Sequence, residues 1–308
     1  MNDSTHDPPV PDSSSSQNPT PSLGPKPWSR LDRTHLAIWA LLAFLPSSII
    51  VFVFQLDGGH TTSVFTVRNE LPSKAIFAFF AALATWILSR MEKRSLTDYG
   101  IPVPPTLKRF AEGSLWGFAM LSLLLLALRA TGHFRVDSID LSGNSVYRYG
   151  LAWAATFLAV SVGEEFSFRG YWLFSVARRL RFWRSAIFTS IIFGVAHLGN
   201  HGENILGILQ VFGTGLLFCF MIRRTGNLWF AVGYHAAWDW AETFFYGTPD
   251  SGLLGVGRFL HSSVQGPTWL TGGSAGPEGS IIANLVLLLC ALFIHLRFPE
   301  IVYPDQPL

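Results

Sequence analysis

The side chains that could carry chemistry in this chain lie inside segments apolar enough to cross a lipid bilayer. Six ionisable residues stand there, in three short motifs: Glu164, Glu165, Arg169, His197, His235 and Asp239. A charged side chain in hydrocarbon costs at least a few kcal/mol unless it faces a protein interior or a water-filled cavity. The motifs therefore predict a functional site inside a membrane protein.

A carboxylate together with two imidazoles is suited to hydrolysis by an activated water molecule. In a partly dry cavity Glu164 would act as the general base, and an N–H group of His235 could stabilise the oxyanion. One such donor is commonly worth about 3–4 kcal/mol. This chemistry requires no Ser or Cys nucleophile, and we expect neither a cofactor nor a metal.

Helical spacing predicts how the side chains of two motifs point. Glu165 and Arg169 are four residues apart, with the carboxylate first, so we expect a buried ion pair that supports the site structurally. Glu164 diverges from its neighbour by about 100°, which leaves it free for chemistry. His235 and Asp239 share a helix face by the same four-residue spacing.

A count of helical rise predicts that the three motifs reach one level of the membrane. Basic residues mark one end of each helix, and a helix rises about 1.5 Å per residue. Counted from those ends, Glu164, His197 and His235 lie roughly 17–21 Å into their helices. Phe193, one turn before His197, is expected to form a wall of the pocket.

Composition indicates that the bilayer is the main solvent of this protein. The mean hydropathy is +0.34, and 14% of the residues are charged, against about 25% in soluble domains. The formal net charge is +2, without a long basic run, so nucleic acid is not an expected partner.

The apolar runs predict an all-α fold: a polytopic membrane bundle of about eight transmembrane helices around a polar cavity. The runs cover residues 36–54, 72–89, 113–130, 153–177, 185–200, 205–222, 228–246 and 280–297. Several are near the lower limit of about 17 residues for a span. Six or seven crossings with re-entrant pieces therefore stay open.

We divide the chain into five parts by composition. They are a disordered Pro/Ser-rich tail (1–29), N-terminal transmembrane helices and connectors (30–148), a catalytic helical core (149–246), a flexible Gly-rich outer loop (247–279), and a C-terminal transmembrane helix and tail (280–308). Most of the 22 Lys and Arg residues fall on one side of this bundle. That bias predicts a multi-pass protein of the plasma (inner) membrane with both termini cytoplasmic.

The order Glu-Glu-x-x-x-Arg-Gly, Phe-x-x-x-His and His-x-x-x-Asp resembles the CAAX-protease and bacteriocin-processing family. This family includes type II prenyl endopeptidases and lysostaphin-resistance-like membrane proteins. The stretch Arg224–Trp229 is similar as well, so the resemblance covers roughly residues 150–245. It implies an all-helical intramembrane glutamic protease that cuts a membrane-associated protein or peptide.

By motif position, the resemblance implies that Glu164 is the general base and that His197 helps to hold the water. His235 and Asp239 would form the oxyanion side. The prenyl-processing enzymes have Asn where this chain has Asp239, and an ionised carboxylate cannot donate to an oxyanion. Asp239 must therefore be protonated or orient His235, and we favour orientation.

Three alternatives stay open at this point. Glu164, His197 and His235 could hold zinc, although the chain lacks His-Glu-x-x-His. A non-catalytic immunity or scaffold protein would use the polar residues only to stabilise the bundle. A proton-coupled transporter would use the carboxylates as a relay.

Overall fold

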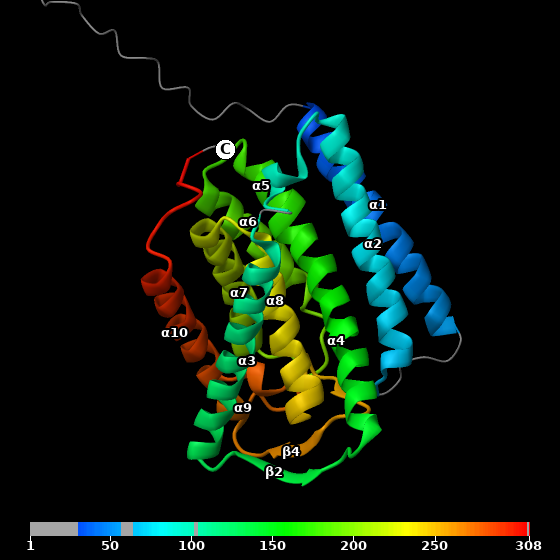
Figure 1. The fold of residues 1–308 in the computed structure, drawn as a ribbon, viewed down its shortest axis with the longest axis vertical. Helices are drawn as coiled ribbons and strands as arrows, with labels where there is room; N and C mark the ends of the chain where they lie inside the picture. The colour runs from blue at the N-terminus through cyan, green and yellow to red at the C-terminus, as the bar shows by residue number, and fades with distance from the viewer. Residues whose placement is uncertain (1–29, 57–63, 102–103, 307) are drawn as a thin grey trace, which may run out of the picture.

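The computed structural model describes residues 30–56, 64–101, 104–306 and 308, and this part of the chain is mostly helical (Figure 1). The predicted disordered tail, residues 1–29, lies outside the described residues. Each of the eight predicted apolar runs contains a helix. The principal helices are α1 (Arg30–Leu56), α2 (Val67–Met91), α3 (Thr106–Ala130), α4 (Asn144–Glu165), α5 (Leu173–Ala177), α6 (Phe182–Ala196), α7 (Ile205–Thr225), α8 (Leu228–Trp240) and α10 (Ile281–Arg297).

Three of these helices are long and apolar enough to cross a membrane, judged over the described residues. They are α2, α3 and α7. Shorter apolar segments lie in α1, α6 and α10. The helices run side by side along the long axis of the molecule, as a bundle does (Figure 1).

Two apolar runs predicted as single helices change their winding near the end. After α4 the chain continues as a π-helix, η2 (Phe166–Trp172), before α5. After α8 it continues as a second π-helix, η3 (Ala241–Tyr246). A π-helical turn holds more residues than an α-helical turn and frequently occurs at functional sites. A π-helical turn therefore changes the direction of the side chains that follow it. A prediction made with 3.6 residues per turn misses this change.

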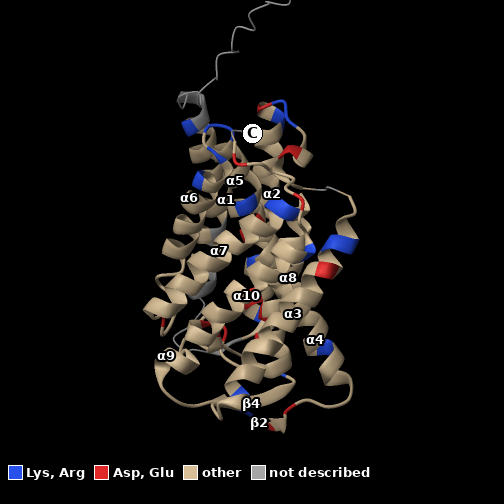
Figure 2. Cartoon of the chain, turned by 90° about the vertical axis from the view of Figure 1, so that its left-hand side faces the viewer, with Lys and Arg blue, Asp and Glu red and all other residues tan. Residues whose placement is uncertain are grey.

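Both described ends of the chain lie at the same end of the bundle, the C-terminal one beside α5 and the N-terminal one beside the end of α2 (Figure 1). Lys and Arg residues gather around this end (Figure 2). The carboxylate of Glu92 connects several segments at this end of the bundle. It accepts hydrogen bonds from Tyr99 Oη at 2.6 Å and from Arg178 Nη2 at 2.7 Å, and it lies 3.2 Å from His35 Nδ1. The backbone N–H of Leu308 donates to the carbonyl of residue 177 at 3.0 Å.

The opposite end corrects the expectation of a purely all-α fold. Strand β2 (Phe134–Ile139) pairs antiparallel with β4 (Leu260–Val264), and β1 (Val64–Phe65) pairs in parallel with β3 (Leu254–Gly255). Chain that leaves the helices must satisfy its backbone N–H and C=O groups, and these short ladders do so.

The segment 247–279 contains regular elements, and its predicted flexibility stays a prediction. Besides β3 and β4 it contains the one-turn helix α9 (Thr268–Thr271) and the 3-10 turn η4 (Pro277–Gly279). Its two ends are joined by a hydrogen bond of 2.7 Å from Gly252 N to Ala275 O. A glycine-rich composition indicates where turns form locally. The pairing of β3 and β4 with strands distant in the sequence cannot be predicted from composition. The other predicted boundaries between parts of the chain stay predictions.

Helices α3 and α8 pack closely because glycine removes the side chain at their contact. A Cβ atom on Gly117 would lie 2.1 Å from the carbonyl oxygen of Tyr234, and one on Gly233 would lie 2.1 Å from that of Phe110. These distances are far below van der Waals contact. The glycines therefore set how near α8 approaches α3.

Adding a methyl group at this contact should destabilise the protein. We expect Gly117→Ala to lower the free energy of unfolding by about 1–3 kcal/mol, as overpacking does. Denaturant unfolding in detergent micelles measures the change. Gly199→Ala is the matched control, because a Cβ there meets no atom within 4 Å. Equal losses for both variants would contradict the close-packing interpretation.

Candidate active site

A cavity of about 410 Å³ lies between the helices and is lined by residues of α2, α4, α6, α7, α8 and α10, and by the segment 247–279. Its walls mix apolar rings with ionisable groups. All four predicted catalytic residues line it: Glu164, His197, His235 and Asp239.

The two neighbouring glutamates point in different directions, as their helical spacing predicts. Glu164 faces the cavity, and its side chain is 21% exposed, whereas the side chain of Glu165 is 0% exposed. Glu165 Oε1 lies 3.2 Å from Arg169 Nη1, in the predicted ion pair. The ring of Phe193 lies 4.0 Å from the Arg169 guanidinium carbon, measured to the ring centroid. The buried cation is therefore held by a carboxylate and by an aromatic face.

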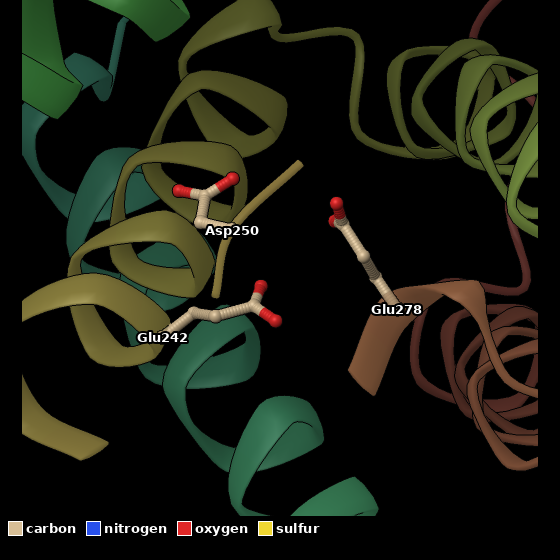
Figure 3. A group of neighbouring side chains, drawn as sticks. All are labelled: Glu242, Asp250 and Glu278. Atoms are coloured by element: carbon tan, nitrogen blue, oxygen red, sulfur yellow. The ribbon is translucent and has the colours of Figure 1, made fainter. Parts of the chain in front are cut away.

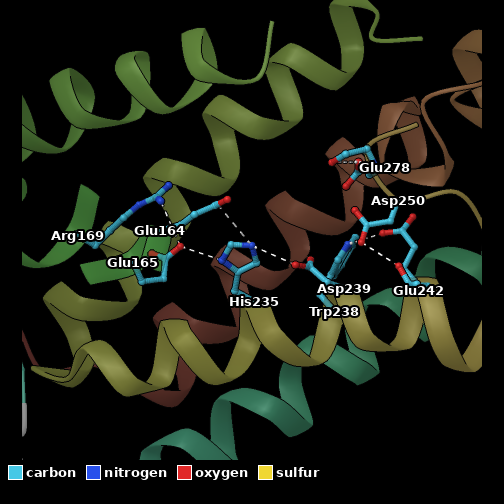
Figure 4. Close-up of polar contacts among 11 residues, drawn as sticks. Glu164, Glu165, Arg169, His235, Trp238, Asp239, Glu242, Asp250 and Glu278 are labelled. Atoms are coloured by element: carbon cyan, nitrogen blue, oxygen red, sulfur yellow. Dashed lines mark hydrogen bonds and ion pairs between the residues drawn. The ribbon is translucent and has the colours of Figure 1, made fainter. Parts of the chain in front are cut away.

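His235 stands at the centre of a group of carboxylates (Figure 4). Its Nδ1 lies 3.0 Å from Glu165 Oε1, and its Nε2 lies 3.4 Å from Asp239 Oδ2 and 3.9 Å from Glu164 Oε2. An ionised carboxylate can only accept, so Nδ1–H donates to Glu165. This bond fixes the plane of the imidazole and directs Nε2 into the cavity.

The contacts add a second carboxylate to the predicted pair of Asp239 and His235. Orientation of His235 by Asp239 stays a prediction, and Glu165 from α4 lies at the other ring nitrogen, Nδ1. Asp239 lies at Nε2, on the same side as Glu164. Four-residue spacing correctly placed Asp239 beside His235. The spacing could not predict which ring nitrogen of His235 would be contacted by a residue on another helix.

His197 follows the last residue of α6, and its ring is fixed locally. Its Nδ1 lies 2.7 Å from the carbonyl oxygen of Phe193. The Phe193 ring packs against the imidazole with centroids 4.4 Å apart. Because a carbonyl only accepts, Nδ1 carries a proton, and in the neutral ring Nε2 is the nitrogen with a free lone pair. The predicted position of Phe193 as a cavity wall beside His197 agrees with the structure.

The proposed zinc ligands do not converge in the way a metal site requires. In the described part of the chain, the set of His, Cys, Asp and Glu donor atoms that gathers within 4.8 Å is Glu242, Asp250 and Glu278. A tetrahedral zinc ion binds its N and O ligands at about 2.0–2.2 Å. Glu164, His197 and His235 share a cavity without forming such a set.

Sequence reasoning missed the contribution of the outer segment to this cavity. Asp250, Ser251 and Glu278 line it together with Glu70 and Lys74 of α2. Loss of hydration on burial raises the pKa of Asp250 to about 6 and that of Glu278 to about 8. Nothing in the local sequence distinguished these two carboxylates from solvated loop residues. Their spacing of 28 residues follows no helical or strand period.

Residues 147–241 match the family model described as Type II CAAX prenyl endopeptidase Rce1-like. The matched segment contains all three motifs of the site and runs from α4 into the first residue of η3. The resemblance drawn from the motifs is therefore confirmed over this segment. A search of the curated proteins found no match.

Breaking the fully buried ion pair should destabilise the bundle more than breaking a partly exposed one. Arg169→Met leaves Glu165 without its fully buried cation, and we expect a loss of about 3–5 kcal/mol in the free energy of unfolding. Arg109→Met breaks the pair with Glu112 at the start of α3, where the side chains are 23% and 25% exposed. The expected loss there is about 0–1 kcal/mol.

Both variants can be compared with wild type by denaturant unfolding in the same detergent. The double variant Glu165→Gln with Arg169→Met should recover part of the loss, because it removes the unpaired charge. A loss at Arg169 no larger than that at Arg109 would contradict the interpretation of Glu165 and Arg169 as a stabilising buried pair.

Proposed function

We propose that the protein is a multi-pass membrane endopeptidase that hydrolyses a peptide bond near a membrane-associated segment of its substrate. The observation that carries the proposal is the convergence of Glu164 and Asp239 on Nε2 of His235, inside a cavity that His197 also lines. The Rce1-like match over residues 147–241 supports the same reaction class.

The membrane part of the proposal places the eight principal helical runs across the bilayer, with the polar cavity inside it. Support comes from the three long apolar helices and the shorter apolar ones. The described ends of the chain lie at one end of the bundle (Figure 1), which fits an even number of crossings. Basic residues favour the cytoplasm, so we assign that end, and both termini, to the cytoplasmic side of the plasma (inner) membrane.

In the proposed mechanism Glu164 removes a proton from a water molecule, whose oxygen attacks the carbonyl carbon of the scissile bond. Nε2 of His197 accepts a hydrogen bond from the same water and helps to hold it. A doubly protonated His235 donates Nδ1–H to Glu165 and Nε2–H to the developing oxyanion. Glu164 then passes the proton to the leaving nitrogen as the C–N bond breaks, releasing a carboxylate and an amine.

Replacing the proposed general base should abolish cleavage while leaving the fold intact. In Glu164→Gln the amide cannot take the proton, and general-base catalysis typically contributes about 10²–10⁴-fold. We expect a loss of at least that size in peptide release. Proteomics of membrane fractions from cells expressing wild type or variant provides the measurement. The matched control is Glu112→Gln, which neutralises a glutamate paired with Arg109 at the start of α3.

The alternatives give different results in the same experiment. A peptide profile that is identical for wild type and Glu164→Gln would count against proteolysis and favour an immunity or scaffold role. Loss of cleavage on treatment with phenanthroline, with recovery on adding zinc, would favour a metallopeptidase. Proton uptake into vesicles that depends on Glu164, without any cleavage, would favour a transporter.

The carboxylate at residue 239 offers a second test, because prenyl-processing relatives have Asn at this motif position. Asp239→Asn retains a hydrogen-bonding group beside Nε2 of His235 and adds an amide donor for the oxyanion. We expect this variant to keep measurable cleavage, whereas Asp239→Leu should lose it. The initial rate of peptide release reports the difference. Equal rates for both variants would exclude a polar role for residue 239.

A further inference from the structure

Three carboxylates that the proposed mechanism does not use lie near one another (Figure 3), and two of them, Asp250 and Glu278, line the cavity. Glu242 belongs to η3, Asp250 follows it in the chain, and Glu278 belongs to η4. One carboxylate oxygen from each residue lies within 4.8 Å of the other two. Figure 3 shows that the three side chains come from separate segments of the chain.

Glu242 has an unpartnered oxygen in a fully buried position. Its side chain is 0% exposed, and Oε2 accepts a hydrogen bond from Trp238 Nε1 at 3.0 Å. The other oxygen, Oε1, has no hydrogen-bond partner among the described residues. Leaving a buried charged group unsatisfied costs several kcal/mol. The buried Glu242 carboxylate therefore has one oxygen that lacks a partner among the described residues.

The polar groups that contact the other two carboxylates are neutral. Thr243 Oγ1 donates to Asp250 at 3.0 Å. The backbone N–H and the hydroxyl of Ser251 donate to Glu278 Oε1 at 2.7 and 3.1 Å. These bonds fix the positions of the carboxylates without offsetting their charge.

We propose that Glu242, Asp250 and Glu278 bind a divalent cation of the calcium class. Calcium takes oxygen ligands at about 2.3–2.6 Å, so two ligands on opposite sides of one ion lie up to about 5 Å apart. The observed spread of at most 4.8 Å fits that limit. Zinc sites usually include a thiolate or an imidazole, and this set contains neither.

The cation would join the outer segment to the helix that carries His235 and Asp239. Asp250 lies near the start of the segment 247–279, and Glu278 lies near its end. Glu242 follows Asp239 by three residues, about one helical turn. One ion bound to all three would thus close the segment on itself and attach it to η3. Its role is to hold the outer wall of the cavity in place.

The test uses the full-length protein purified in detergent micelles and stripped of ions with EGTA. Calcium is titrated by calorimetry to about 10 mM, ten times the weak end of the usual range for extracellular sites. We expect one calcium ion bound per chain and a rise in Tm on calcium addition. Magnesium, with its preference for shorter bonds and retained waters, should bind more weakly.

Variants assign the binding to these residues. Glu242→Gln and Asp250→Asn should each lower calcium affinity by about tenfold or more, because each removes one charged ligand. Asp137→Asn, in an exposed pair with Arg135 on β2, is the matched control and should bind as wild type does. If Glu242→Gln does not fold, Asp250→Asn alone decides, since Asp250 is half-buried whereas Glu242 is fully buried.

Terbium, a luminescent substitute for calcium, adds a local readout. Trp238 is hydrogen-bonded to Glu242, so terbium emission excited through tryptophan should fall in Trp238→Phe while the number of bound ions stays one. The proposal is overturned if neither calcium nor terbium binds, if Glu242→Gln and Asp250→Asn bind calcium as wild type does, or if magnesium binds more tightly. It is also overturned if acidification alone reproduces the rise in Tm without a bound ion.

Discussion

One buried carboxylate, Glu165, connects the stability of the bundle to the chemistry of the cavity. It is fully buried, pairs with Arg169 at 3.2 Å and accepts a hydrogen bond from His235 at 3.0 Å. A single charge in an apolar interior would be strongly destabilising, whereas a set with opposite charges and hydrogen bonds is tolerated. The same contacts that make the charges tolerable direct Nε2 of His235 toward Glu164. Removing the network would therefore disturb both properties together.

Close helix packing brings this network together, because its members come from different helices. Glycines allow α8 to lie against α3, and α8 carries His235 toward the end of α4. The π-helical turn after Glu165 places Arg169 beside the aromatic rings of Phe193 and Phe218. The cation thereby contacts α6 and α7 as well. The polar centre is thus held by backbone geometry and by aromatic packing rather than by solvent.

The segment 247–279 lines the cavity together with the helices. Its strands and turns bring Asp250 and Glu278, which line the cavity, next to Glu242 of η3. Lys and Arg residues gather around the opposite end of the bundle (Figure 2). The strand end also carries cations, but there Arg135 and Arg258 are paired with Asp137 and Asp140.

The sequence by itself determined the helical runs and the pairs that lie within one helix. The divergence of Glu164 from Glu165 and the nearness of His235 to Asp239 follow from helical period, which is a local property of the chain. Only the tertiary structure decided that Glu165 takes Nδ1 of His235 and that a glycine-rich segment returns carboxylates to the cavity. Such contacts depend on how helices and turns distant in sequence pack together, and no local period encodes that packing.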